Sequence, residues 1–404
     1  MTGNPSTYLG ELFKSSRKKG EEGLPLLSVT LNDGLIVRDL LDRRTETNLD
    51  ANEHLLVKSG DIVYNMMRVW QGALGRASVN GLVSPAYVVL RPNAKIDSLY
   101  AEYLFKTPRM IYLFWAYSYG LTKDRLRLYF KDFARIQVTI PNLEEQKKIA
   151  QILSTWDKAI TTTEQLLASS QQQKKALMQQ LLTGKKRLLD KNGVRFSREW
   201  KICQLSDVVS SLDSGVSVNG VEQEVSASNF VLKTSCVSDG VFAPEEMKQV
   251  VEETEITRLK ELLLDDSILI SRMNTPALVG ANAYVKSAPS NTYLPDRLWQ
   301  VKINSSKVMM RWLAFWFSSE KTRTALSDLA SGTSGSMKNI SKKSVFTMPI
   351  QCPSLEEQHK IAAVLSTADQ EITALQQKLE ALKQEKKALM QQLLTGKRRI
   401  INNI

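Results

Sequence analysis

The twelve residues KKALMQQLLTGK occupy positions 174–185, and the same twelve residues occur again at positions 386–397. At the same offset of 212 residues, LEEQKKIAQILSTWDKAIT at 143–161 matches LEEQHKIAAVLSTADQEIT at 355–373, with thirteen of nineteen residues identical and no gap. The chain therefore carries one long, Leu-rich segment twice. The two copies divide the rest of the sequence into two segments, one before each copy.

Both copies have the periodicity of a coiled-coil helix, with seam positions at alternating steps of four and three residues. Each copy starts just after a proline, Pro141 or Pro353, and stops at Gly184 or Gly396, as suits a helix C-terminus. A helix over residues 144–182 would be roughly 58 Å long. The apolar seam residues are Ile149, Leu153, Trp156, Ile160, Leu167, Leu177 and Leu181 in the first copy, and Ile361, Leu365, Ile372, Leu375, Leu379, Leu389 and Leu393 in the second.

Two matching helices in one chain pair most simply with each other. Lys174 and Lys386 occupy matching seam positions, and a single polar residue in a seam commonly fixes register and orientation. We therefore expect an antiparallel coiled coil, with the two lysines toward opposite ends and solvated there. The alternative is that each amphipathic helix lies on a separate globular core.

The segments before and between the helices have α+β character. Short β-like runs such as DIVYNM (61–66) and DSILISRMN (266–274) are followed by amphipathic stretches at 100–119 and 308–330. The two segments share an order of features rather than a sequence. We therefore expect one α/β fold twice, joined by the two helices in an internal pseudo-twofold repeat. The expected domains are 1–142 and 190–354, each a globular domain, and 143–189 and 355–404, each a spacer helix.

Charge and composition narrow the function classes. The formal net charge of +12 favours an anionic partner such as nucleic acid, because Lys and Arg side chains displace counterions from phosphates. No run approaches the roughly 18 to 20 apolar residues of a membrane span, and residues 1–10 lack the pattern of a signal peptide, so we expect a cytoplasmic protein that engages no membrane. The scattered Cys203, Cys236 and Cys352 form no metal motif, and no metal site is expected.

The repeated motifs are similar to those of a known family. The pattern Pro-x-Leu-Glu-Glu-Gln-x-Lys-Ile-Ala is present from Pro141 and again from Pro353, and both helices end in Ala-Leu-Met-Gln-Gln-Leu-Leu-Thr-Gly-Lys. Glu199-Trp200-Lys201, followed by Leu-Ser-Asp-Val at 205–208, opens the second globular segment. In this combination and order, over nearly the whole length, the chain resembles the specificity subunits of type I restriction-modification systems.

The resemblance implies a division of labour between subunits. Two target recognition domains would each read one half of a bipartite, asymmetric double-stranded DNA target. The helices would act as spacers and dock two methyltransferase subunits, and restriction subunits would join in the larger complex. This chain would then be a non-catalytic subunit of an adenine-specific methyltransferase and endonuclease complex. It would hold no cofactor, and S-adenosylmethionine, ATP and Mg would be used by the partner subunits.

The residues themselves offer little sign of catalysis. A P-loop would need glycine where Gln179 and Gln391 stand. Asp61, Asp265 and Asp266 could be imagined as carboxylates of a free-standing nuclease, which is one alternative function. Another alternative is a coiled-coil scaffold whose globular domains bind proteins.

DNA recognition requires side chains that reach base edges and others that hold phosphates. Arg suits the acceptors of guanine, and Asn or Gln can pair with adenine, so we selected such residues at strand ends and in Gly-containing loops. The first domain offers Arg68, Trp70, Gln71, Arg76, Lys123, Arg125 and Arg127, and the second offers Arg272, Asn274, Arg297, Ser334, Lys338 and Asn339. The basic cluster after the first helix, formed by Lys185, Lys186, Arg187, Lys191, Arg195 and Arg198, is expected to face phosphates or solvent.

Overall fold

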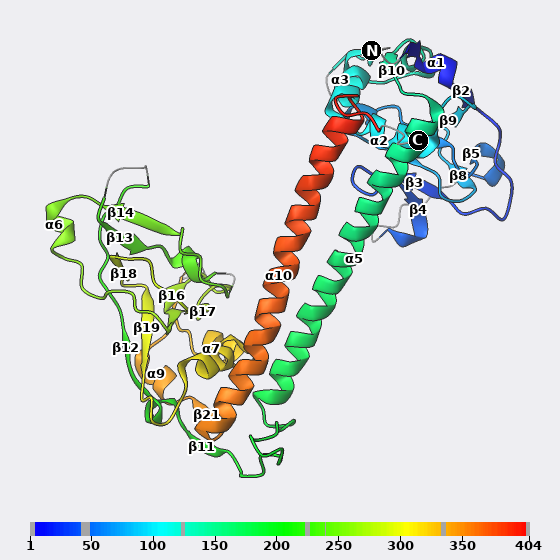
Figure 1. The fold of residues 1–404 in the computed structure, drawn as a ribbon. Coiled ribbons are helices and arrows are strands. Elements are labelled where there is room, and N and C mark those ends of the chain that lie inside the picture. Colours follow the sequence, from blue (N-terminus) through cyan, green and yellow to red (C-terminus); the bar gives the residue numbers. More distant parts are fainter. Residues whose placement is uncertain are drawn as a thin grey trace. The chain divides into compact units, whose positions relative to one another are not determined.

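A computed structural model describes residues 5–41, 49–122, 126–222, 227–238, 240–332 and 337–400. The chain divides into two compact units, which are described separately (Figure 1). Unit 1 comprises Met1–Gln165 with Gln376–Ile404, and unit 2 comprises Leu166–Leu375. Among the described residues, no helix combines the length and the apolar character needed to cross a membrane.

Unit 1 contains a mixed α+β domain followed by the start of a long helix. Its main sheet has the order β2-β9-β6-β7, with every neighbouring pair antiparallel. The elements are β1 (Ser6–Tyr8), α1 (Leu9–Leu12), β2 (Phe13–Ser16), β3 (Leu27–Val29), β4 (Leu35–Val37), η1 (Arg38–Leu40), η2 (Ala51–Glu53), β5 (Leu55–Val57), β6 (Ile62–Asn65), η3 (Val69–Gln71), β7 (Leu74–Arg76), β8 (Gly81–Val83), β9 (Tyr87–Pro92), α2 (Ser98–Phe105), α3 (Pro108–Ala116), α4 (Phe130–Phe133), β10 (Gln137–Thr139) and α5 (Leu143–Leu181).

Unit 2 repeats this plan with a main sheet of order β12-β19-β15-β17, again antiparallel throughout. The elements are β11 (Lys201–Gln204), η5 (Leu205–Asp207), β12 (Val209–Asp213), β13 (Asn229–Leu232), η6 (Thr234–Val237), β14 (Met247–Val250), α6 (Glu253–Ile256), β15 (Ser267–Ser271), β16 (Met273–Asn274), β17 (Asn282–Val285), β18 (Thr292–Tyr293), β19 (Leu298–Ile303), α7 (Met310–Ser318), α8 (Glu320–Asp328), β20 (Lys338–Asn339), α9 (Lys342–Phe346), β21 (Pro349–Cys352) and α10 (Leu355–Leu393).

The repeat in structure begins well before the repeat visible in sequence. Helices α2, α3 and α4, strand β10 and helix α5 each start 212 residues before α7, α8, α9, β21 and α10, respectively. The same register therefore holds without a gap from residue 98 to the end of α5. The prediction of one α+β fold present twice, with a long helix after each copy, is confirmed.

Capping residues and aromatic packing explain the short helices of unit 1. Asp97 accepts a hydrogen bond from the backbone N–H of Tyr100 at the start of α2, and Thr107 caps α3 immediately before a helix-favouring proline. The rings of Phe105, Phe114 and Phe133 contact one another within the core. In unit 2, the core under the sheet is built around Trp299, Trp312 and Phe317.

In each unit, the start of one long helix packs beside the end of the other, so the two run antiparallel there. Ile149 and Leu153 of α5 share a core with Leu393 of α10 in unit 1, and Leu181 of α5 shares a core with Ile361 and Leu365 of α10 in unit 2. Separate cores for the two helices are therefore excluded. The remaining predicted seam residues are half-buried, namely Trp156, Ile160, Leu167, Leu177, Ile372, Leu375, Leu379 and Leu389.

The prediction that the seam lysines are solvated is wrong. The Lys174 ammonium lies 2.5 Å from the Asp369 carboxylate and 5.9 Å from the centre of the Phe315 ring. Lys386 makes the equivalent ion pair with Asp157 in unit 1. Each lysine is half-buried because the facing helix supplies an aspartate at the repeated position, and the neighbouring ring provides a favourable surface for the cation.

Candidate DNA interface

Two glutamines of the repeated motif fix the start of each long helix against its globular domain. The side-chain amide of Gln146 accepts a hydrogen bond from the Asp97 N–H at 2.9 Å and donates to the Pro141 carbonyl at 2.9 Å. Gln358 makes the same two contacts, with the Met309 N–H at 2.8 Å and the Pro353 carbonyl at 3.0 Å. Both side chains are fully buried, so each helix leaves its domain in a fixed direction.

The preceding glutamates are held by arginines that follow the other helix. Glu357 receives both a 2.6 Å and a 2.7 Å hydrogen bond from Arg187, together with a 3.0 Å bond from the Trp200 indole. At the 212-residue offset, Arg399 makes a bidentate pair with Glu145 at 2.9 and 2.8 Å. Sequence reasoning missed these pairs, although the constant offset of both partners was the available signal.

The basic cluster after the first helix was therefore misinterpreted at one position. Arg187 faces neither phosphate nor solvent, because its guanidinium is committed to Glu357 and lies 5.5 Å from the centre of the Trp200 ring. A bidentate pair of this kind fixes geometry as well as charge. The end of α5 is thereby tied to the start of α10 within unit 2.

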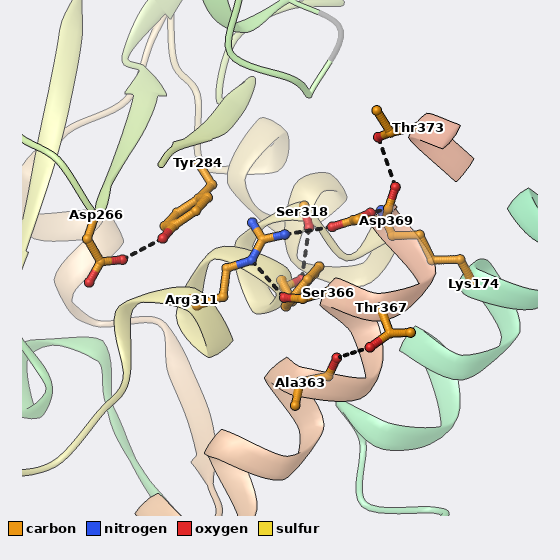
Figure 2. Close-up of polar contacts among 11 residues, drawn as sticks. Lys174, Asp266, Tyr284, Arg311, Ser318, Ala363, Ser366, Thr367, Asp369 and Thr373 are labelled. Atoms are coloured by element: carbon orange, nitrogen blue, oxygen red, sulfur yellow. Dashed lines mark hydrogen bonds and ion pairs between the residues drawn. The ribbon is translucent and has the colours of Figure 1, made fainter. Parts of the chain in front are cut away.

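A second arginine ties the recognition domain of unit 2 to α10 (Figure 2). Arg311 of α7 donates to the Asp369 carboxylate at 2.6 Å and to the Ser366 hydroxyl at 3.2 Å. Its guanidinium also lies 4.4 Å from the centre of the Tyr284 ring, and the Tyr284 hydroxyl donates to Asp266 at 2.7 Å. Burial, followed by this hydrogen bond, raises the pKa of Tyr284 to about 12.

Asp61, the other carboxylate considered for a nuclease besides Asp265 and Asp266, is also engaged by the scaffold. It is buried and accepts two hydrogen bonds from Arg91, at 3.3 and 3.1 Å. The Asp265 carboxylate accepts the Ala288 N–H at 2.6 Å. These contacts give each group a local structural role.

In unit 1, the segment that follows β6 presents two of the selected residues to solvent. The Asn65 side chain accepts the Met67 N–H at 2.9 Å, and the Trp70 indole donates to the Met67 carbonyl at 2.9 Å. This closed loop leaves Arg68 and Gln71 exposed, while Trp70 packs partly against the core. We name residues 65–73 the first reading segment.

Arg76 has a structural role within the domain. It is half-buried on β7, and its Nε donates to the Ser98 hydroxyl at 2.8 Å, at the start of α2. Trp70 is likewise half-buried and packs against the core. The structure thus separates these two selected residues from Arg68 and Gln71, which face outward.

An antiparallel backbone bridge lies directly beside the first reading segment. Tyr119 and Arg127 exchange backbone hydrogen bonds of 3.2 and 3.0 Å, and the Leu128 N–H donates to the Met66 carbonyl at 3.0 Å. Arg127 is exposed, and it directly precedes Leu128, whose N–H contacts the first reading segment. The selected residues Lys123 and Arg125 lie outside the described residues.

In unit 2, the segment that follows β15 brings several selected residues together. The Arg272 N–H donates to the Arg297 carbonyl at 3.0 Å, and the short strands β16 and β20 pair Asn274 with Lys338 and Met273 with Asn339. Arg272, Asn274, Arg297, Lys338 and Asn339 therefore surround one end of the sheet, and we name residues 271–281 the second reading segment. Ser334 lies outside the described residues.

The side chains of the second reading segment are held in different ways. Asn274 uses its amide internally, donating to the Ser271 hydroxyl at 3.2 Å and accepting the Thr275 N–H at 2.8 Å. Arg272 lies with its guanidinium 5.9 Å from the centre of the Trp299 ring, and its buried Nε has no hydrogen-bond partner within the described chain. The buried Nε–H of Arg272 is thus not used in a hydrogen bond within the described residues.

Arg323 supports the second reading segment and was not anticipated from the sequence. Its guanidinium donates to the carbonyls of Val279 at 2.6 Å and Ala277 at 3.3 Å. Burial lowers the pKa of Arg323 from its ordinary value. At the 212-residue offset stands Ile111, on a helix that packs against the first reading segment through η3. The same helix position therefore supports both reading segments, by apolar packing in one unit and by hydrogen bonds in the other.

The two interfaces share one backbone plan. Each reading segment follows the equivalent strand, β6 or β15, in the same sheet order. The Tyr119–Arg127 bridge recurs at the constant offset as the Ser331–Asn339 bridge, with two backbone hydrogen bonds of 2.9 Å. One frame thus carries two different sets of outward side chains.

The family described as the type I restriction modification DNA specificity domain matches residues 9–169 and 197–384. The chain belongs to this family. The predicted identity as a DNA specificity subunit, non-catalytic and with two recognition domains, is confirmed. This specificity subunit carries its two reading segments within the two matched stretches.

Individual relatives agree with the family. The specificity subunit is similar to the type I restriction enzyme MjaVIII specificity subunit of Methanocaldococcus jannaschii, with 26% identity over 374 residues, covering 87% of this chain and 82% of the relative. It is also 25% identical over 323 residues to a putative type I restriction enzyme MjaX specificity subunit of the same organism, covering 78% of this chain and 71% of the relative.

Solved structures show the same fold. The HsdS subunit from Thermoanaerobacter tengcongensis superposes with a TM-score of 0.51 at 17% identity, covering 98% of this chain and 97% of that one. The S subunit of a type I restriction-modification system from M. genitalium superposes with a TM-score of 0.56 at 14% identity, covering 96% and 95%. At these identities the likeness concerns the fold alone.

Proposed function

We propose that the specificity subunit recognises a bipartite, asymmetric double-stranded DNA target, with one half-site read by each recognition domain. The observation that carries this proposal is the repeated frame with unlike outward residues. Arg68 and Gln71 follow β6, whereas Arg272 and Asn274 follow β15, so different side chains come after equivalent strands of equivalent sheets. A frame that repeats while its exposed side chains differ is suited to reading two unlike sequences.

The chemistry of the two reading segments fits base recognition. Arginine can donate two hydrogen bonds to the major-groove acceptors of guanine, and glutamine can pair with adenine. The exposed Arg68, Gln71 and Arg297 and the half-buried Arg272 and Lys338 supply such donors, and the overall charge of +12 adds attraction to phosphates. Phosphate contacts position the protein, and base-edge contacts distinguish sequences.

Catalysis in this proposal belongs to partner subunits. Two methyltransferase subunits dock along the helix pair and use S-adenosylmethionine to modify adenine, and restriction subunits use ATP and Mg. The complex works in the cytoplasm, on chromosomal or incoming DNA. This chain holds no cofactor, and its role is to place the partners on the correct sequence.

The test is a methylation map. The chain is purified with its methyltransferase subunits, and methylated adenines on genomic DNA are located by single-molecule sequencing. The expected result is a single motif of two defined halves around an unread centre. Exchange of residues 198–354 for those of another specificity subunit is expected to change one half only. An assembled complex that binds S-adenosylmethionine but methylates no defined motif would instead favour a scaffold with protein-binding domains.

A further inference from the structure

Helix α3 of unit 1 and helix α8 of unit 2 are equivalent in the repeat, yet they present different chemistry to solvent. Both helices begin at the constant offset, and each is capped by a hydroxyl residue, Thr107 or Ser319. Their inward positions agree, since Phe114 and the equivalent Leu326 are both fully buried. The two helices thus keep a large apolar residue at this buried position, whereas their outward faces differ in chemistry.

The outward face of α3 and of the segment after it is aromatic. Tyr112, Trp115 and Tyr119 are 62%, 47% and 49% exposed. Tyr112 and Trp115, three residues apart, lie on one side of α3, and Tyr119 follows the helix in the bridge to Arg127. We name these three residues the aromatic face. The equivalent residues of unit 2 are Thr324, Ser327 and Ser331.

The aromatic face consists of a pair of rings on α3 and a third ring beyond the helix that contacts another tyrosine and a cation. The ring centres of Tyr112 and Trp115 lie 5.8 Å apart, and Tyr119 lies 5.5 Å from Tyr129. The Lys131 ammonium lies 5.7 Å from the centre of the Tyr119 ring. Exposed aromatic rings grouped in this way often mark a surface that meets a ligand or partner.

The aromatic face adjoins the surface expected to meet DNA. Helix α3 packs against η3 of the first reading segment, which exposes Arg68. Tyr119 is itself one partner of the backbone bridge whose other partner is the exposed Arg127. Arg109, three residues before Tyr112, is exposed on the same helix. Aromatic rings among arginine and lysine side chains are the combination that suits bases and phosphates together.

The comparison of the two units decides between DNA and a protein partner. Two copies of one methyltransferase subunit would require a similar surface on both units, but unit 2 has only hydroxyl side chains at these three positions. What differs between the units is the half-site that each one reads, an argument that rests on the proposed function. The aromatic face therefore belongs to the half-site of unit 1.

We propose that Tyr112, Trp115 and Tyr119 make apolar contacts with bases and deoxyriboses of the half-site read by unit 1. These contacts add affinity that unit 2 obtains by other means. Because apolar contacts release no counterions from phosphates, their contribution does not depend on salt in the way that lysine and arginine contacts do. The proposal thus predicts a signature that separates the aromatic face from its basic neighbours.

The test replaces the aromatic face with the residues of unit 2. The variant Tyr112→Thr, Trp115→Ser, Tyr119→Ser is prepared in complex with the methyltransferase subunits, and the Kd for duplex DNA carrying the methylated motif is measured at several salt concentrations. We expect the Kd to rise by about 10- to 100-fold, with the slope of log Kd against log salt unchanged. Arg109→Ala is expected to reduce that slope instead.

Two further variants keep the proposal falsifiable. Replacement of all three residues by phenylalanine retains the rings, and we expect this variant to keep most of the affinity. If substitution at these positions caused a folding defect, this variant would lose affinity as well. Tyr8→Ala removes a similarly exposed ring, 47% exposed on β1, and is expected to leave the Kd unchanged. Methylation mapping of the Thr/Ser/Ser variant should show weaker recognition of one half-site. This should be the half-site that Arg272→Ala does not affect.

The outcomes that overturn the proposal are distinct. Loss of complex assembly in the Thr/Ser/Ser variant would make the aromatic face a protein-docking surface. An unchanged Kd would also overturn it, as would a reduced salt slope equal to that of Arg109→Ala. Failure of the proposed function would appear earlier, because the wild-type complex would then show no preferred sequence.

Discussion

The two units of the specificity subunit place their reading segments in the same way but hold them by different chemistry. In unit 1, Ile111 lies on the helix that supports the first reading segment, whereas Arg323 supports the second through two carbonyl oxygens. Leu99 stands where unit 2 has Arg311. By contrast, the glutamine and glutamate contacts at the helix starts are the same in both units. The difference teaches that the helix junctions are constrained and that the interior of each recognition domain can vary.

The largest expected effect tests the helices as a ruler. One heptad is inserted after Ser170 and another after Glu371, which contact each other at 3.2 Å and so mark the same level of the helix pair. Seven residues add roughly 10.5 Å of helix, or about three base pairs, while heptad phase is retained. We expect methylation of the original motif to be lost and a motif with a longer centre to appear.

Methylation mapping of the double-insertion complex gives the result directly. The control is insertion into one helix only, which should abolish pairing at that level and yield no motif. A double insertion that changed the bases of either half-site, rather than the distance between them, would contradict the ruler.

The second prediction compares the two arginine–glutamate pairs. Glu357→Gln leaves Arg187, only 18% exposed in its side chain, without its counter-charge, and removing one partner of a buried pair typically costs about 3–5 kcal/mol. The effect of Glu145→Gln should be smaller, because the Arg399 side chain is 44% exposed and can be solvated. Urea unfolding followed by tryptophan fluorescence measures both free energies of unfolding.

The exposed neighbour Glu356 provides a matched control. Glu356→Gln removes the same charge from the same helix turn and is expected to leave the free energy of unfolding nearly unchanged. Equal losses for Glu357→Gln and Glu145→Gln would show that burial of the arginine does not set the strength of these pairs.

A smaller effect is expected at Arg311, where unit 2 can be made like unit 1. Arg311→Leu introduces the residue of position 99 and removes the hydrogen bonds to Asp369 and Ser366. We expect a loss of roughly 1.5–3 kcal/mol, the usual range for a hydrogen bond to a charged group. The loss should stay below that of Glu357→Gln, because Lys174 remains paired with Asp369.

Arg311→Lys sharpens the interpretation. Lysine keeps the positive charge but lacks the planar guanidinium that lies over Tyr284 and Phe315. If Arg311→Lys were as stable as wild type in urea, charge alone would explain the contact. We expect it to recover only part of the loss.

Much of this architecture could be predicted because the helices must keep their sequence. The seam residues, the prolines before each helix and the glycines after it are nearly identical in the two copies. The antiparallel helix pair and the two copies of the fold could therefore be predicted. The earlier part of the repeat, from residue 98, could not be detected. There the frame requires only that buried positions stay apolar, as with Phe114 and Leu326, and the exposed positions are free to differ.

The individual contacts were less predictable, for a related physical reason. Selecting Arg and Asn at strand ends led to the segments that follow β6 and β15, because the sequence marks where strands stop. Whether such a residue faces outward depends on partners far along the chain. Arg76 donates a hydrogen bond to Ser98, and Arg187 pairs with Glu357. Lys174, which we expected to be solvated, pairs with Asp369. No local pattern announces these pairings.

The smallest expected effect concerns the tyrosine that lies against Arg311. Burial and the hydrogen bond to Asp266 raise the pKa of Tyr284 to about 12 in the folded protein, whereas an unfolded tyrosine has a pKa of about 10. Its contribution to stability is therefore complete below pH 10 and is lost as the pH rises toward 12, because the unfolded chain releases the proton first. Tyr284→Phe cannot titrate and lacks this loss.

Thermal unfolding of wild type and Tyr284→Phe at pH 8 and pH 11 tests this difference between folded and unfolded states. At pH 8, the wild type should be slightly more stable, by about 0.5–1.5 kcal/mol for one hydrogen bond. At pH 11, that advantage should shrink or reverse, since only the wild type gains a stabilising ionisation on unfolding. An advantage that did not change between the two pH values would mean that Tyr284 is not held in its neutral form by its surroundings.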